Sequence, residues 1–334
     1  MPDAILETKI HPPKLIPSLM EGFNAVASHI HIIFLPVAFD LLLWFGPLLR
    51  VKDLLLPAIL DATEISAAAY GQDSQLFIDS SKELWMAMLE QFNLFFGLRT
   101  YPVGIPSLLL SKGVLENPMG AQHVIEMQSS SLTLWLLIAF TLAGLALGSL
   151  YFALIASVVS EDGAPVRLAT FVGQMLQAML LSVILFAALF LISMPAMCLI
   201  SSLLFFIPAL GTIPLLLFGL ILVWVLMPVV FSPHGIFADQ LKAAAAIANS
   251  FRLVRSLMSL TGMFFIMLIM LSYGLDFLWS TPKADNWMLL VGIIGHAFIS
   301  SGLIAASFIY YQKGIRWLRA AAPLAAAVKP ENIA

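Results

Sequence analysis

Three ionisable side chains, Asp40, Asp276 and His296, lie within otherwise apolar stretches of this sequence. Ionisable groups in apolar segments of membrane-spanning length cost about 2.5–3.5 kcal/mol each on insertion scales, so each needs a partner or a function. Two carboxylates and one imidazole could exchange protons or line an outward-opening site for a small solute. The same groups could instead form a structural hydrogen-bonded pair, or be hydrated where the apolar segments end.

The positions of these residues along their segments predict how they meet. Asp40 precedes the end of its segment by about eight residues and His296 follows the start of its own by about nine, which puts both roughly 12 Å inside. We therefore predict that Asp40 and His296 pair directly. Asp276 lies about one helical turn from the end of its segment, at the mouth of the same candidate site.

No other combination of residues indicates metal, cofactor or enzyme chemistry. His29 and His31 point in different directions on a helix, so they do not form a two-histidine metal face. Cys198 is the only cysteine, which excludes an internal disulfide and a cysteine-based metal site. The sequence also lacks phosphate-binding, dinucleotide-binding, zinc-protease and serine-hydrolase motifs. We predict a non-enzymatic protein with neither metal nor cofactor.

The elements that hold these residues are indicated by one long run without charge. No Asp, Glu, Lys or Arg occurs from Leu168 to Ala238. A bilayer core about 30 Å thick is crossed by about 20 apolar residues in a helix, so this run must cross more than once. A mean hydropathy of +0.99, with 61% hydrophobic and 10% charged residues, excludes a water-soluble globular domain. The net charge of -3 is too small to indicate a nucleic-acid partner.

The hydropathy pattern predicts an all-α, multi-pass transmembrane bundle with six spans. The least obvious boundary separates the third span from the fourth, and it rests on Pro208 and Gly211, which stop a helix. The predicted spans are 21–48, 130–159, 170–200, 207–232, 257–280 and 287–312.

The distribution of Lys and Arg near the ends of these spans predicts their orientation. With six spans, most basic residues fall on the side of the two termini, and the short loops of the other side hold only Lys283. A seventh span would move Lys313, Arg316 and Arg319 to the outside. We therefore expect a cytoplasmic-membrane protein whose N-terminal segment, 1–20, and C-terminal tail, 313–334, are both cytoplasmic.

Amphipathic helices are predicted at both membrane surfaces. In the outer region, 49–129, Ser80 and Glu83 form a capping box ahead of a helix over 80–97. Its apolar face would lie in the membrane interface or pack on the ends of the spans. On the inner face, 236–256 is predicted as an elbow helix within the five-span bundle 130–312.

Polar, basic and small residues near the spans suggest further contacts. Arg252 and Arg255, where the elbow meets the fifth span, are expected to contact lipid phosphates. The glutamines Gln174 and Gln177 are expected to bond to neighbouring helices. A Gly144-x-x-x-Gly148 pattern permits a close helix contact, and an internal contact is favoured over a dimer.

A short motif in the second half resembles a known family. It comprises Ser232-Pro233-His234-Gly235-Ile236, then Ala245-x-x-x-Asn249 and the run Ser250-Phe251-Arg252-Leu253-Val254-Arg255, with two spans following. This part, about 168–312, resembles the six-span membrane domains attached to some glycerophosphodiester phosphodiesterases, and related stand-alone bacterial membrane proteins. The resemblance implies a six-span fold with an elbow helix. It does not imply phosphodiesterase activity, because the chain lacks that domain.

These observations favour a non-enzymatic accessory or organising component of the membrane or of a membrane complex. Its expected partners are membrane lipid and other membrane proteins. A transporter or permease component that uses Asp40, Asp276 and His296 is the alternative. A lipid-modifying enzyme is a third possibility, for which only the same three groups could serve.

Overall fold

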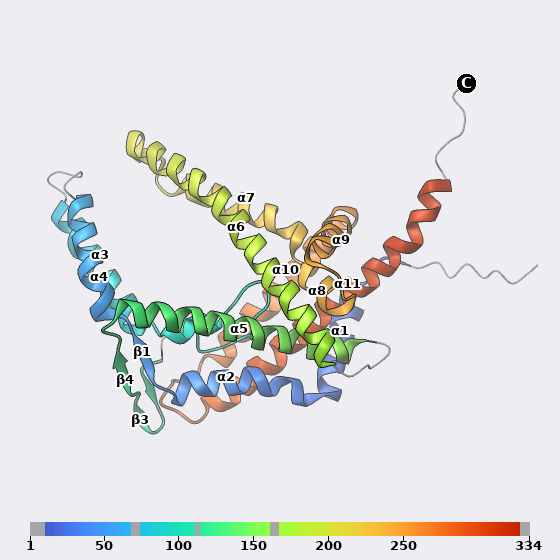
Figure 1. Ribbon diagram of the computed structural model, residues 1–334, viewed down its shortest axis with the longest axis horizontal. Coiled ribbons are helices and arrows are strands. Elements are labelled where there is room, and N and C mark those ends of the chain that lie inside the picture. The colour runs from blue at the N-terminus through green and yellow to red at the C-terminus, as the bar shows by residue number, and fades with distance from the viewer. Residues whose placement is uncertain (1–10, 68–73, 111–113, 161–166, 328–334) are drawn as a thin grey trace, which may run out of the picture. The chain divides into compact units, whose positions relative to one another are not determined.

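The protein is an integral, multi-pass membrane protein with an all-α fold (Figure 1). The structure is a computed structural model that describes residues 11–67, 74–110, 114–160 and 167–327. The chain divides into two compact units, which we describe separately. Unit 1 consists of Met1–His29, Phe152–Met270 and Gly302–Ala334, and unit 2 consists of Ile30–Tyr151 and Leu271–Ser301.

Five helical stretches in the described part of the chain are long and apolar enough to cross a membrane. They are Ser130–Val159, Leu168–Leu204, Ile213–Ala238, Met258–Trp279 and Leu289–Ala321. They correspond to the second to sixth predicted spans. The predicted break at Pro208 and Gly211 is confirmed, because one of these stretches ends at Leu204 and the next begins at Ile213. Between them Gly211 adopts a φ of 54°, which suits a residue without a side chain.

The first predicted span, 21–48, is wrong as one continuous helix. Helix α1 (Leu15–Ser28) ends before the 3₁₀ turn η1 (Ile30–Ile33), and α2 (Phe34–Phe45) begins after this turn. Pro36 accounts for the position of the break, because proline has no N–H to donate to the preceding turn and its ring collides with that turn's carbonyl.

Unit 1 contains α1, the last part of α5 (Ser130–Val159) and helices that follow it. Its other elements are α6 (Leu168–Phe206), η4 (Pro208–Leu210), α7 (Ile213–Leu226), η5 (Met227–Val229), α8 (Ser232–Ala238) and α9 (Ala243–Ser256), with parts of α10 (Met258–Trp279) and α11 (Leu289–Ala327). Helix α6 is about 58 Å long, and the chain then folds back as α7 (Figure 1).

The elbow predicted as one helix over 236–256 is two helices. α8 and α9 are separated at residues 239–242, where Gln240 has a φ of 53°. A non-glycine residue in the left-handed region ends a helix, which explains the interruption. The chain turns here, and Tyr311 donates a hydrogen bond to the carboxylate of Asp239 at 2.8 Å.

Unit 2 holds the loop-rich region and parts of α5, α10 and α11. Its further elements are β1 (Leu48–Arg50), α3 (Lys52–Ala67), α4 (Ser74–Gln91), η3 (Leu94–Leu98), β2 (Glu116–Asn117), β3 (Gly120–Ala121) and β4 (Val124–Glu126). The strands, which the sequence analysis did not predict, form a parallel β1–β4 pair and an antiparallel β2–β3 pair. Arg50 and Glu126 form an ion pair across β1 and β4.

The predicted surface helix over 80–97 is also shifted. α4 begins at Ser74 and packs beside α3, so Ser80 lies inside the helix and is not its cap (Figure 1). After α4 ends at Gln91, Asn93 is the N-cap of η3, and its side chain accepts a hydrogen bond from the Phe95 N–H. Leu84, Trp85 and Met88 on α4 are exposed. Leu89 is buried in a cluster against which Leu136 and Phe140 pack, so only this part of the predicted apolar face packs on the end of a span.

Candidate functional site: the polar centre of unit 2

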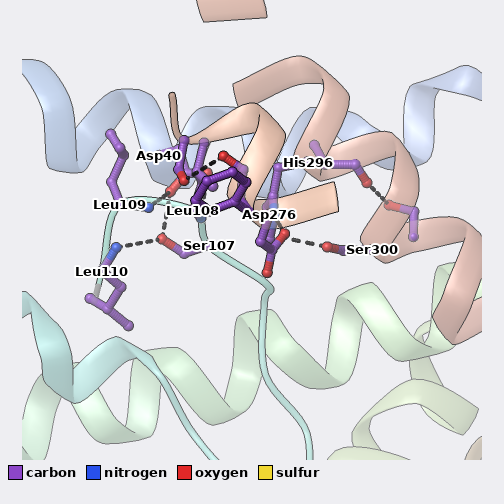
Figure 2. Close-up of polar contacts among 12 residues, drawn as sticks. Asp40, Ser107, Leu108, Leu109, Leu110, Asp276, His296 and Ser300 are labelled. Atoms are coloured by element: carbon purple, nitrogen blue, oxygen red, sulfur yellow. Dashed lines mark hydrogen bonds and ion pairs between the residues drawn. The ribbon is translucent and has the colours of Figure 1, made fainter. Parts of the chain in front are cut away.

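Asp40 is a fully buried carboxylate on α2, and a loop supplies its partners (Figure 2). It accepts hydrogen bonds from the Ser107 hydroxyl at 2.5 Å and from the backbone N–H groups of Leu108 and Leu109 at 3.0 and 3.2 Å. The Ser107 hydroxyl in turn accepts from the Leu110 N–H at 3.1 Å. Asp40 therefore holds a tight turn of backbone against α2, and these donors offset the cost of burying a charge.

The end of α2 is fixed by polar side chains from the region after the loop. Asn117 donates to the Trp44 carbonyl at 3.2 Å, and Gln122 donates to the Leu43 and Trp44 carbonyls at 2.7 Å each. The indole of Trp44 donates to the Ala284 carbonyl at 2.8 Å. These bonds satisfy carbonyls that a helix end leaves free, and they set the position of Asp40.

His296 on α11 has a different carboxylate partner, Asp276 on α10. Nδ1 of His296 lies 2.6 Å from Oδ1 of Asp276, and Nε2 lies 3.3 Å from the Ser300 hydroxyl (Figure 2). The His296 side chain is 6% exposed, whereas that of Asp276 is 34% exposed. The close approach of α10 and α11 depends on Gly295, where a Cβ would lie 2.8 Å from the ring of Trp279.

The predicted direct pair of Asp40 and His296 is therefore wrong. The structure does bring the three predicted residues into unit 2, with His296 in electrostatic range of Asp40, but His296 bonds to Asp276 and Asp40 to the loop. The sequence analysis missed Ser107 and Ser300. A buried carboxylate needs donors, and backbone amides of an irregular segment can supply them as well as side chains of the spans.

Two cavities in unit 2 are lined in part by Leu109, whose N–H donates to Asp40. One cavity has a volume of about 60 Å³, and its lining includes Leu43, Phe92 and Leu110. The other has a volume of about 310 Å³, and its lining includes Glu116 and Leu289. Neither is lined by Asp40, Asp276 or His296. Across the described residues, no cluster of three His, Cys, Asp or Glu could hold a metal ion. The polar centre is arranged to fix a loop and a helix pair.

Unit 1 has a separate polar core that the sequence analysis predicted only in part. As expected, Gln174 donates to the Ile236 and Phe237 carbonyls at 3.3 and 3.1 Å, and Gln177 accepts from the Ala243 N–H at 2.9 Å. The imidazole of His234 lies 2.7 Å from the Ser307 hydroxyl, among aromatic rings. The sequence signal for this contact was His234 itself, which lies in the motif that carries the family resemblance.

Arg252 and Arg255 are exposed on α9, beside the exposed ring of Phe251. The opposite face of α9 is buried through Ala243, Ala246, Ser250, Leu253 and Val254. The basic residues thus lie on the face that the protein leaves open.

Comparisons of this chain with protein-family models, with curated proteins and with solved structures find no match.

Proposed function

We propose that this chain is a non-enzymatic accessory component of a membrane complex, and that it binds a membrane-embedded partner through α6 and α7. One observation carries the proposal. Between Phe186 and Leu226, which we call the apolar arm, no described side chain is buried. The arm also contains no Asp, Glu, Lys or Arg.

Helices of a multi-pass protein ordinarily bury one face against their neighbours, and a helix that is apolar all round belongs in a protein core or in a membrane. By contrast, α7 has no buried residue, and its stretch from Ile213 to Ala238 has a mean hydropathy of 2.7. Within unit 1, α6 makes its contacts with α8 and α9 near its own beginning, where Gln174, Ala178, Leu181 and Leu185 are buried. The apolar arm, which follows these buried residues, suits a partner whose surface is also apolar.

Photo-crosslinking in native membranes tests this proposal. A photoreactive residue at Phe190 or Leu220 on the arm should give one discrete protein adduct. The matched controls are Trp135 on α5 and Phe277 on α10, which are 68% and 82% exposed. These positions should give lipid adducts. Lipid adducts alone from all four positions would contradict the proposal.

The proposed location is the cytoplasmic membrane, with both termini in the cytoplasm. The Lys and Arg distribution supports it, as does an even number of crossings if α1 and α2 together form one broken span. In a Cys198→Ser background, an impermeant thiol reagent applied to intact cells should label Ser80→Cys and spare Ser256→Cys. The opposite labelling would reverse the orientation.

Lipid contacts are proposed at both surfaces. On α9, Arg252 and Arg255 would bind lipid phosphates while Phe251 enters the acyl region. On α4, Leu84, Trp85 and Met88 would lie in the outer interface, where tryptophan is common in membrane proteins.

Transport and lipid modification receive less support. Both would use Asp40, Asp276 and His296, yet the cavities beside them are lined by other residues and the Asp40 oxygens already accept three hydrogen bonds.

A further inference from the structure

The helical hairpin formed by α3 and α4 in unit 2 is anchored at one end. The two helices pack beside each other (Figure 1). At the anchored end Leu89 of α4 is buried, and Leu56 and Ile59 of α3 pack against the same cluster. Further along α3, Thr63 is buried, whereas the side chain of Ile65 is 77% exposed. One side of α3 therefore faces outward with a large apolar residue on it.

Acidic residues lie beside this exposed isoleucine. Asp61 and Glu64 are both exposed. Asp61 precedes Ile65 by four residues and Glu64 by three, so the three side chains are neighbours on the surface of the helix. Neither carboxylate forms an ion pair with another described residue. Together the three residues form a small surface, which we call the α3 patch, with one apolar and two anionic side chains.

The hairpin as a whole has a strong negative charge. From Lys52 to Gln91 the sequence holds seven acidic residues and two lysines, which gives a formal charge of -5. One lysine, Lys52, is already paired with Glu90 at 3.1 Å. The connection over 68–73, which lies outside the described residues, contains no Lys or Arg. The negative balance therefore does not depend on how that connection is arranged.

This charge decides which occupant suits the α3 patch. In a two-fold contact a second copy of the chain would present the same negative surface, and like charges oppose such a contact. A surface of anionic lipid would repel the hairpin for the same reason. Across the described residues no cluster of acidic side chains could hold a metal ion. An apolar residue beside two carboxylates instead suits a partner that is both apolar and basic.

We therefore propose that the α3 patch binds a basic amphipathic helix of another protein. An apolar side chain of the partner packs on Ile65, and its Lys or Arg side chains pair with Asp61 and Glu64. Amphipathic helices are bound through apolar anchors at helical spacing, and complementary charges fix their orientation. The inference is independent of the apolar arm, of the lipid contacts on α4 and of the orientation of the chain in the membrane.

The test uses the whole chain in phosphatidylcholine nanodiscs and a fluorescent peptide of Leu, Ala and Lys that forms an amphipathic helix. Fluorescence anisotropy measures binding, with empty nanodiscs as the blank. An exposed ion pair contributes about threefold to affinity, so Asp61→Asn with Glu64→Gln should lose about tenfold. The control, Glu116→Gln with Asp285→Asn, removes the same charge from exposed residues elsewhere and should lose less than about twofold. Ile65→Ser should also lose about tenfold, because it removes the apolar anchor.

Several results would overturn the proposal. Equal losses in the two double variants, or no loss from Ile65→Ser, would mean diffuse attraction between charges. Equally tight binding of a peptide with Glu in place of Lys would refute the basic partner. In native membranes, a photoreactive residue at the exposed Ala58 should cross-link to a segment rich in Lys or Arg, identified by mass spectrometry. Adducts with lipid alone, or with a second copy of this chain, would identify a different occupant. Unchanged melting of the variants verifies that they are folded.

Discussion

Asp40 in unit 2 is fully buried and accepts three hydrogen bonds, whereas no described side chain of the apolar arm in unit 1 is buried. The buried carboxylate finds its hydrogen-bond donors inside the protein. In the arm, the described side chains are exposed or only partly covered by the protein. The position of Asp40 is thus determined by contacts within the chain, while the arm depends on its surroundings. Substitutions in the two regions should therefore have opposite consequences in the isolated protein.

The largest effect is expected from Asp40→Ala. It leaves the hydroxyl of Ser107 and two N–H groups without an acceptor in a buried place, so the free energy of unfolding should fall by about 3 kcal/mol or more. Asp40→Asn keeps one acceptor oxygen and should lose less. SDS-induced unfolding in mixed micelles measures both, with the exposed Asp61→Ala as the control. Equal stability of Asp40→Ala and Asp61→Ala would show that the loop does not depend on the carboxylate.

A matched pair of glycines tests the same contrast at intermediate size. A Cβ at Gly148 on α5 would lie 2.8 Å from the Cα of Gly104, whereas one at Gly219 on α7 would meet nothing within 4 Å. Gly148→Ala should lower the unfolding free energy by about 1–3 kcal/mol because backbone must move apart. Gly219→Ala should be neutral or stabilise by up to about 1 kcal/mol, as alanine favours a helix.

The same unfolding assay measures this pair in the isolated protein. A large loss from Gly219→Ala would mean that the arm packs on this chain, and the comparison between the regions would fail.

Much of the architecture could be predicted from the sequence, because hydropathy and helix-stopping residues act locally. The charge-free run indicated α6 and α7, and Pro208 with Gly211 marked the turn between them. The predicted internal contact of Gly144 and Gly148 is confirmed against the segment that holds Leu98 and Gly104. Each of these inferences needed only neighbouring residues.

The partners of Asp40 could not be predicted in this way. Two of its three donors are backbone N–H groups, which every non-proline residue carries, so no residue type marks Leu108 or Leu109 as special. The choice of His296 between two carboxylates depends on which helices are neighbours, and depth along each span does not contain that information. The break before α2 had a signal in Pro36, which the prediction of a continuous span overlooked.

A smaller effect distinguishes a direct contact from mere proximity inside the polar centre. Asp276→Asn and His296→Gln each weaken the 2.6 Å bond, so the double variant should lose less stability than the sum of the two single variants. Polar pairs between membrane helices couple by about 0.6 kcal/mol on average and roughly 1.7 at most, and the same range is expected here. Asp40→Asn combined with His296→Gln should be additive within about 0.5 kcal/mol, because the two side chains interact only at longer range. A stronger coupling of His296 to Asp40 than to Asp276 would restore the pairing predicted from depth. It would also mean that the loop at Ser107 is not the principal partner of the buried carboxylate.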